Sequence, residues 1–337
     1  MAPDAPLTRI LRAELELSIG RGAESRRLLT PLLETMPLWE RLHVDLALAR
    51  MSDGELVSAK RGVDDALALG VDGPDLAMVN RTLVKAISGP DWAQRSTFAS
   101  SRFEVVANID AATCKRVADL LEGTHTLLAR QLGAVAGTGR SKVLLFAGPD
   151  GFHRYVEELW GSRICPNICG FYHPLTKQML VCNDARESEL LATVRHEGLH
   201  LFLDRLAPQA PVWLHEGLAC YYERKVVSGT SFADGPADPA RIAWLQAHPL
   251  VPLAEFLARS PSAFYADAEQ SYAQAWALAT VLLDTKPEHK KRFLAYWKEL
   301  MAGALPEVAL RSAFAPEVLA GLDRELTAFV LGLAVPK

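Results

Sequence analysis

Residues 186–207 read RESELLATVRHEGLHLFLDRLA and predict a long amphipathic helix. Its apolar positions recur at the spacing of one helix face; they are Leu190, Leu191, Val194, Leu199, Leu201 and Leu203. His196 and His200 are four residues apart, so their imidazoles share a face and can bind one metal ion. Glu197 follows the first histidine, where its carboxylate can hold a metal-bound water. This helix is therefore expected to carry a metal site.

A second segment, PVWLHEGLACYYE at 211–223, carries a glutamate that could supply a third ligand. Catalytic zinc sites keep three protein ligands and leave one position open for water. Neighbouring residues on a helix point about 100° apart, so His215 and Glu216 cannot both face the metal. The pattern His-Glu-x-x-His, followed by a helix that carries a glutamate, is typical of zinc metalloproteases.

Three segments together resemble the gluzincin metallopeptidases, and more narrowly the bacterial peptidase-MA-like domains. They are HEGLH (196–200), PVWLHEGLA (211–219) and SYAQAWALATVLL (271–283), and the resemblance covers about residues 100–290. It implies that Zn²⁺ is held by His196, His200 and Glu216, with His215 as the alternative third ligand. It also implies that Tyr272 lies near the metal.

The resemblance further implies a zincin-like fold, in which the strand before the metal-binding helix holds extended substrate. That role falls either to residues 170–172 or to the return strand at 178–181. Many relatives carry an acidic residue four positions after the ligand glutamate, and here that position is Cys220. The task of orienting a ligand histidine then passes to Glu223, to another residue or to the backbone, or is lost. A metzincin site is excluded, because Leu203 and Leu206 occupy its Gly and His positions.

The expected activity is zinc-dependent hydrolysis of peptide bonds. Glu197 would activate a zinc-bound water and pass its proton to the leaving amine. Tyr272 is the first candidate for stabilising the oxyanion, followed by Tyr222 and His173. No segment resembling the aminopeptidase GxMEN motif precedes the metal helix, which favours an endopeptidase.

Two alternatives to a peptidase stay open. The first is a catalytically inactive zinc-binding scaffold, or a protein that binds a partner through its N-terminal helices. The second is a zinc hydrolase that acts on a non-peptide amide, which no sequence feature separates from a peptidase.

Residues 1–90 are expected to be all helical, because apolar residues recur there at helical spacing between turns that contain glycine. Gly22 and Gly54 lie about one tetratricopeptide period apart. The segment therefore resembles helical hairpins of that type, and a plain helical bundle is the alternative. Ser88–Asp91 interrupts the helical pattern, so a zincin-like catalytic domain is expected at 91–337. Its upper α/β lobe would span about 91–210 and its helical lower lobe about 211–337, giving an α+β fold with a small mixed sheet.

Composition narrows the classes of partner. The chain has 337 residues and a net charge of −4, with no basic run, so a nucleic-acid partner is not expected. No apolar stretch is long enough to span a membrane. The N-terminus does not resemble a signal peptide, which predicts a cytoplasmic protein, or a secreted one if a leader has been removed. The five cysteines do not form a disulfide framework, and for Cys165 and Cys169 we favour a local disulfide or ordinary thiols over metal binding.

Overall fold

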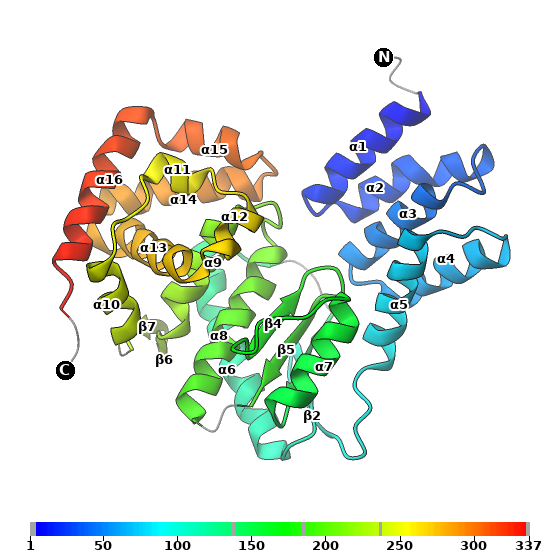
Figure 1. The fold of residues 1–337 in the computed structure, drawn as a ribbon, viewed down its shortest axis with the longest axis horizontal. Helices are drawn as coiled ribbons and strands as arrows, with labels where there is room; N and C mark the ends of the chain where they lie inside the picture. The colour runs from blue at the N-terminus through cyan, green and yellow to red at the C-terminus, as the bar shows by residue number, and fades with distance from the viewer. Residues whose placement is uncertain (1–4, 136–138, 184–185, 236–237, 335–337) are drawn as a thin grey trace. The chain divides into compact units, whose positions relative to one another are not determined.

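The computed structural model describes residues 5–135, 139–183, 186–235 and 238–334 (Figure 1). It confirms a mixed α+β chain, mostly helical with a small mixed sheet. Contacts divide the chain into two compact units. The first comprises Met1–Glu122 and Gly137–Thr193, and the second comprises Gly123–Ala136 and Val194–Lys337. This division falls inside α6 (Ala111–Leu132) and α8 (Glu187–Asp204), whereas the sequence suggests boundaries near residues 90 and 210.

The first unit begins with helices only, at the places where the sequence has helical periodicity. They are α1 (Pro6–Ser18), α2 (Gly22–Leu29), the short 3₁₀ helix η1 (Thr30–Glu34), α3 (Glu40–Ser52), α4 (Leu56–Ala68) and α5 (Pro74–Ser88). Gly20, Gly54 and Gly70 end three of them with φ values of 75°, 78° and 82°. Only glycine adopts this backbone conformation at little cost. From α1 to α5, each helix packs against the next one in the chain.

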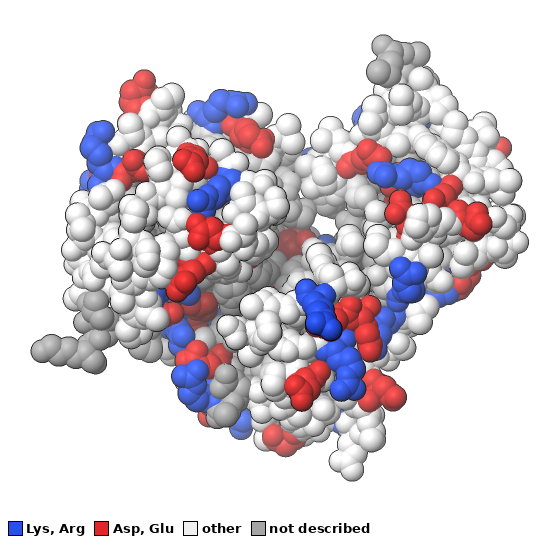
Figure 2. Space-filling view, in the orientation of Figure 1, with Lys and Arg blue, Asp and Glu red and all other residues white. Residues whose placement is uncertain are grey.

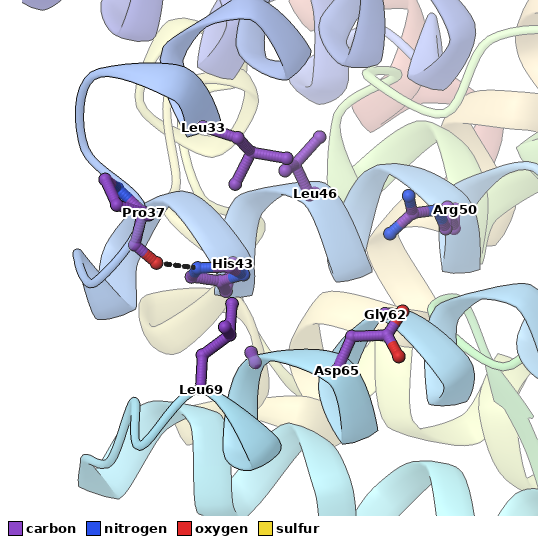
Figure 3. A pocket seen from close by; sticks show the side chains of 9 residues that line it. Leu33, Pro37, His43, Leu46, Arg50, Gly62, Asp65 and Leu69 are labelled. Carbon is purple, nitrogen blue, oxygen red and sulfur yellow. Dashed lines mark hydrogen bonds between the residues drawn. The ribbon is translucent and has the colours of Figure 1, made fainter.

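A hollow of about 220 Å³ lies among these helices (Figure 3). Leu33, Leu46 and Leu69 supply much of its apolar wall. His43 also lines it, with Nε2 2.8 Å from the carbonyl oxygen of Pro37. This contact satisfies the histidine within the helical region, so it gives His43 a structural role.

The first unit continues into a five-stranded mixed sheet in the order β1-β2-β3-β5-β4. The strands are β1 (Ser96–Ala99), β2 (Phe103–Ala107), β3 (Ser141–Phe146), β4 (Gly170–His173) and β5 (Gln178–Cys182). β2, β3 and β5 are parallel, whereas β1 and β4 pair antiparallel at the two edges. Strands predicted from the sequence at 101–109 and 141–148 are found as β2 and β3, and the hairpin predicted at 170–183 as β4 and β5, whereas β1 was not anticipated. α7 (Pro149–Trp160) packs on β3 and β5.

The sheet order separates the two segments expected to hold extended substrate. Residues 178–181 belong to β5, which pairs with β3 on one side and β4 on the other. Its backbone groups are therefore already used by the sheet, and it cannot accept a further strand. Residues 170–172 belong to β4, which pairs only with β5 among the described strands. Of these two segments, only β4 could accept an added strand.

The structure corrects one local expectation in this unit and decides between two alternatives for another. Asp150 is a plausible N-cap by sequence, but α7 begins two residues earlier than that cap implies, with Gly148 as N-cap, Pro149 as its first residue and Asp150 inside the first turn. Proline suits that position because its missing N–H has no partner there in any helix. Cys165 and Cys169 are both free thiols.

The second unit is built around buried helices that follow α8. They are α9 (Val212–Glu223), α10 (Pro239–Ala247), α11 (Leu253–Leu257), α12 (Pro261–Ala266), α13 (Ala268–Thr280), the π-helical turn η2 (Val281–Thr285), α14 (Pro287–Met301), α15 (Pro306–Ala313) and α16 (Pro316–Leu331). A small hairpin, β6 (Val226–Ser228) and β7 (Ser231–Ala233), was not anticipated. Trp213 is buried and its ring stacks on that of Tyr296 at 6.1 Å, so it packs in the core of this unit.

Helices α9 and α13 approach closely at Gly217, the residue that follows Glu216. A Cβ atom on Gly217 would lie 2.7 Å from the carbonyl oxygen of Ala275. Real Cβ atoms do not come this close to a backbone oxygen, so a larger residue would push the two helices apart. Glycine at this position therefore sets how deeply Glu216 is placed in the unit.

Charged residues of both signs are interspersed on the face drawn in Figure 2, without an extended basic area among the described residues there. No helix among the described residues is long and apolar enough to cross a membrane.

Candidate metal centre

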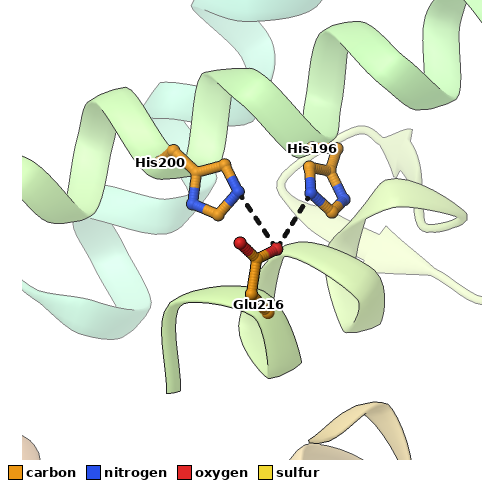
Figure 4. A group of neighbouring side chains, drawn as sticks. All are labelled: His196, His200 and Glu216. Atoms are coloured by element: carbon orange, nitrogen blue, oxygen red, sulfur yellow. Dashed lines mark ion pairs between the residues drawn. The ribbon is translucent and has the colours of Figure 1, made fainter. Parts of the chain in front are cut away.

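His196, His200 and Glu216 converge on one point within the second unit (Figure 4). The two imidazoles project from α8, and the carboxylate reaches them from α9. Oε2 of Glu216 lies 3.4 Å from Nε2 of His196 and 3.4 Å from Nε2 of His200. The structure thus brings together the three residues that the sequence selects as ligands.

The donor set fits a zinc ion. Two ligand atoms at tetrahedral positions, each about 2.0–2.1 Å from zinc, are separated by about 3.3 Å. Both distances to the Glu216 oxygen match that separation. Oε2 of Glu216 is also buried and has no hydrogen-bond partner among the described residues. A buried carboxylate oxygen without a partner is costly, and a bound cation removes that cost.

The charges around the site are coupled. Burial would lower the pKa of His196, but its contacts with Cys220, Glu216 and Glu223 raise that pKa well above the usual range. Burial would raise the pKa of Glu216, but the two histidines hold it well below the usual range. A negative carboxylate facing two imidazoles is the arrangement in which a metal ion replaces protons.

Glu197 is buried, with 7% of its surface exposed, and it is adjacent to the first ligand histidine. Its negative charge raises the pKa of both Tyr265 and Tyr272, after the larger effects of desolvation and of Glu216. The carboxylates of Glu197 and Glu216 therefore act on the same pair of phenol groups. The expected base is therefore in the same electrostatic neighbourhood as the ligand carboxylate.

Glu223 takes the place of the carboxylate that the sequence lacks at position 220. Its Oε2 lies 2.9 Å from Nδ1 of His196, the nitrogen turned away from Glu216. Cys220 is buried, and burial raises the pKa of its thiol. Of the alternatives left open by the sequence, the Glu223 side chain is the carboxylate that contacts Nδ1 of His196, and Cys220 lies in the same group of atoms. An imidazole held in this way presents its other nitrogen to a metal.

Tyr265 is a site residue that the sequence analysis missed. It lies in α12, and its hydroxyl donates a 2.7 Å hydrogen bond to Oε1 of Glu216. This contact leaves Oε2 alone facing the histidines. The only pattern that could have drawn attention to Tyr265 is its spacing, seven residues before Tyr272.

The three expected oxyanion donors lie in different surroundings. The ring of Tyr272 is 6.3 Å from that of His196, centroid to centroid, so this residue is near the site. The hydroxyl of Tyr222 instead donates to Oε1 of Gln131 at 2.6 Å, which accounts for it structurally.

His173 belongs to the other unit, at the end of β4, and burial lowers its pKa to about 4. Its Nδ1 accepts the backbone N–H of Thr176, which requires the neutral ring. This places it in the turn of the hairpin. The structure therefore gives Tyr222 and His173 structural roles.

His215 does not join the ligand group. Its ring stacks on that of His200 at 5.9 Å, with an angle of 22° between the planes. Burial, together with the nearby His200, lowers the pKa of His215 to about 4. It therefore packs behind a ligand as a neutral ring, as helix geometry requires if Glu216 faces the metal.

A scan of the sequence against protein-family models found no match, and a search of curated proteins found none either. The geometry of the side chains therefore carries the functional argument.

Proposed function

We propose that the chain is a zinc-dependent hydrolase of peptide bonds, of the gluzincin type, with His196, His200 and Glu216 as ligands. The observation that carries the proposal is the 3.4 Å separation of the buried Oε2 of Glu216 from Nε2 of both imidazoles. Bound zinc would polarise a water molecule and a substrate carbonyl group, and would lower the pKa of that water toward neutrality. The zincin-like fold and the endopeptidase preference are part of this proposal.

The residues of the chain divide the remaining work. Glu197 accepts a proton from the attacking water and delivers it to the leaving amine. Tyr272 donates a hydrogen bond to the oxygen of the substrate carbonyl as negative charge develops on it. Tyr265 keeps Glu216 in place through Oε1. Glu223 holds the ring of His196 through Nδ1.

The position of Glu197 supports hydrolysis over a purely structural metal site. Structural zinc sites are closed by four protein ligands, whereas catalytic sites keep three and an open position. Three residues form the ligand group, and Glu197, the buried neighbour of His196 in the sequence, does not belong to it. This arrangement is the one that a water-activating base needs.

Glu197→Gln tests the proposal, because it removes the base and keeps the size of the side chain. We expect the variant to bind zinc as the wild type does and to lose at least about 100-fold in turnover. Zinc content and cleavage of casein and of a mixed peptide library measure the two properties.

A variant that cleaves at the wild-type rate would overturn the role of Glu197. A wild-type chain that binds zinc and cleaves no peptide would instead favour a zinc-binding scaffold that recruits a partner.

A further inference from the structure

Glu223 is held from three sides within the second unit. Its Oε2 lies 2.9 Å from Nδ1 of His196, and its Oε1 accepts a 2.9 Å hydrogen bond from Nη2 of Arg241. Its backbone oxygen accepts a 2.8 Å hydrogen bond from Nη1 of Arg195. The last residue of α9 thus links the metal-binding helix α8 to Arg241 in the first turn of α10.

Arg241 has supports of its own, apart from Glu223. Asp238 caps α10 by accepting hydrogen bonds from the backbone N–H groups of Ala240 and Arg241. The guanidinium carbon lies 5.9 Å from the centre of the Trp276 ring on α13. Only 14% of the Arg241 side chain and 12% of the Glu223 side chain are exposed. The position of the guanidinium group therefore does not depend on its contact with Glu223 alone.

The same neighbourhood contains a second set of donor atoms, from His196, Cys220 and Glu223, all within 4.8 Å of one another. A second metal ion there would lie beside the positive guanidinium of Arg241, which already occupies one oxygen of the only carboxylate in the set. Two positive charges next to each other in a buried site repel strongly. The arrangement therefore favours a hydrogen-bonded support for His196 over a second metal site.

We propose that Arg241 is a positioning residue that sets the zinc affinity of the site through Glu223, although it contacts none of the ligands. The inference rests on the proposed zinc site. A carboxylate that accepts the Nδ1–H proton orients the imidazole and makes Nε2 a better donor. The guanidinium balances the buried carboxylate and fixes which oxygen faces the imidazole. Without it the carboxylate is left uncompensated, and a buried charge in that state reorients or is neutralised.

The test is a double-mutant cycle of zinc affinity. The dissociation constant is measured by competition with a chromophoric chelator for the wild type, Glu223→Gln, Arg241→Gln and the double variant. Each single change is expected to weaken binding by about 10- to 100-fold. The double variant should bind no more weakly than Glu223→Gln, because Arg241 acts through that residue. Arg241→Lys should recover part of the loss, since it restores the charge without the fork geometry.

Lys286→Gln is the matched control. It removes the 2.7 Å ion pair between Lys286 and Glu325, which lies in the same unit and touches no ligand. Its zinc affinity should equal that of the wild type. Thermal unfolding of each metal-free variant reports whether the fold is retained, and affinities are compared among variants that unfold cooperatively.

Three outcomes are informative. Unchanged affinity in Arg241→Gln, with tight binding by the wild type, overturns the inference and leaves the proposed function intact. Losses that add up in the double variant also overturn it, since Arg241 would then act independently of Glu223. A wild-type chain that does not bind zinc overturns the proposed function itself.

Discussion

At the scale of single residues, the sequence predicted the ligands of the metal site but not all of the side chains that contact them. His196 and His200 were predictable because a helix turns a spacing of four into a shared face. Glu216 needed helix geometry and a family likeness together. Tyr265 was missed because its contact with Glu216 depends on where α12 packs against α9, and no periodicity encodes that.

Position 220 is a second place where the sequence alone did not identify the side chain that supports His196. The sequence left open whether Glu223, another residue or the backbone takes over the role of the carboxylate missing at position 220, or whether that role is lost. The structure places Glu223, three residues farther along α9, on Nδ1 of His196. Residues three apart on a helix lie on nearly the same face, so either position can serve the same imidazole.

Replacing each of the two tyrosines near the site with phenylalanine is expected to change a different property. Tyr272→Phe should lower kcat by about 100-fold with little change in KM, because it removes a donor to the developing oxyanion. Tyr265→Phe should weaken zinc binding by about 10- to 100-fold, because it frees Oε1 of Glu216.

Steady-state kinetics with zinc in excess, and a chelator competition for zinc, separate these two effects. A Tyr265→Phe variant with wild-type zinc affinity and reduced kcat would contradict the positioning role of Tyr265 and would indicate that it stabilises the oxyanion.

At the scale of elements, the periodicity of the sequence predicted the long helices, but the strands β1, β6 and β7 were not predicted. The long helices follow from runs of eight or more residues with one clear pattern, and the β4–β5 hairpin, with strands of four and five residues, follows from two short apolar runs around a turn. β1 has four residues, and β6 and β7 have three each, so their formation depends on pairing that a local pattern does not reveal. The edge position of β4 also came only from the sheet order, because sequence fixes neither neighbour of a strand.

The packing of α9 on α13 gives a prediction at this scale. Gly217→Ala should destabilise the chain by about 1–3 kcal/mol, because its Cβ would meet the carbonyl oxygen of Ala275 at 2.7 Å. The same displacement should move Glu216 and weaken zinc binding. Chemical denaturation with and without zinc measures both effects.

Gly321→Ala in α16 is the matched control, since a Cβ there meets no heavy atom within 4 Å. Alanine at an open helical position should leave stability unchanged or raise it by up to about 1 kcal/mol. Equal effects of the two substitutions would show that the approach of α9 to α13 does not matter.

At the scale of the whole molecule, all the residues assigned to the metal centre belong to one of the two units. The ligands, Glu197, the two tyrosines and the Glu223–Arg241 pair lie in Gly123–Ala136 and Val194–Lys337. The other unit contributes the N-terminal helices and the sheet. The division inside α6 and α8 was not predictable, because an unbroken helix gives no local sign that its two ends pack in different units.

The zinc content of the full chain tests the central claim most directly. The wild type, Glu216→Ala and His215→Ala are stripped of metal, loaded with zinc, dialysed and analysed for bound metal. We predict about one zinc ion per chain in the wild type and in His215→Ala, and loss of zinc in Glu216→Ala. A wild-type chain without zinc, or a loss confined to His215→Ala, would contradict the site described by His196, His200 and Glu216.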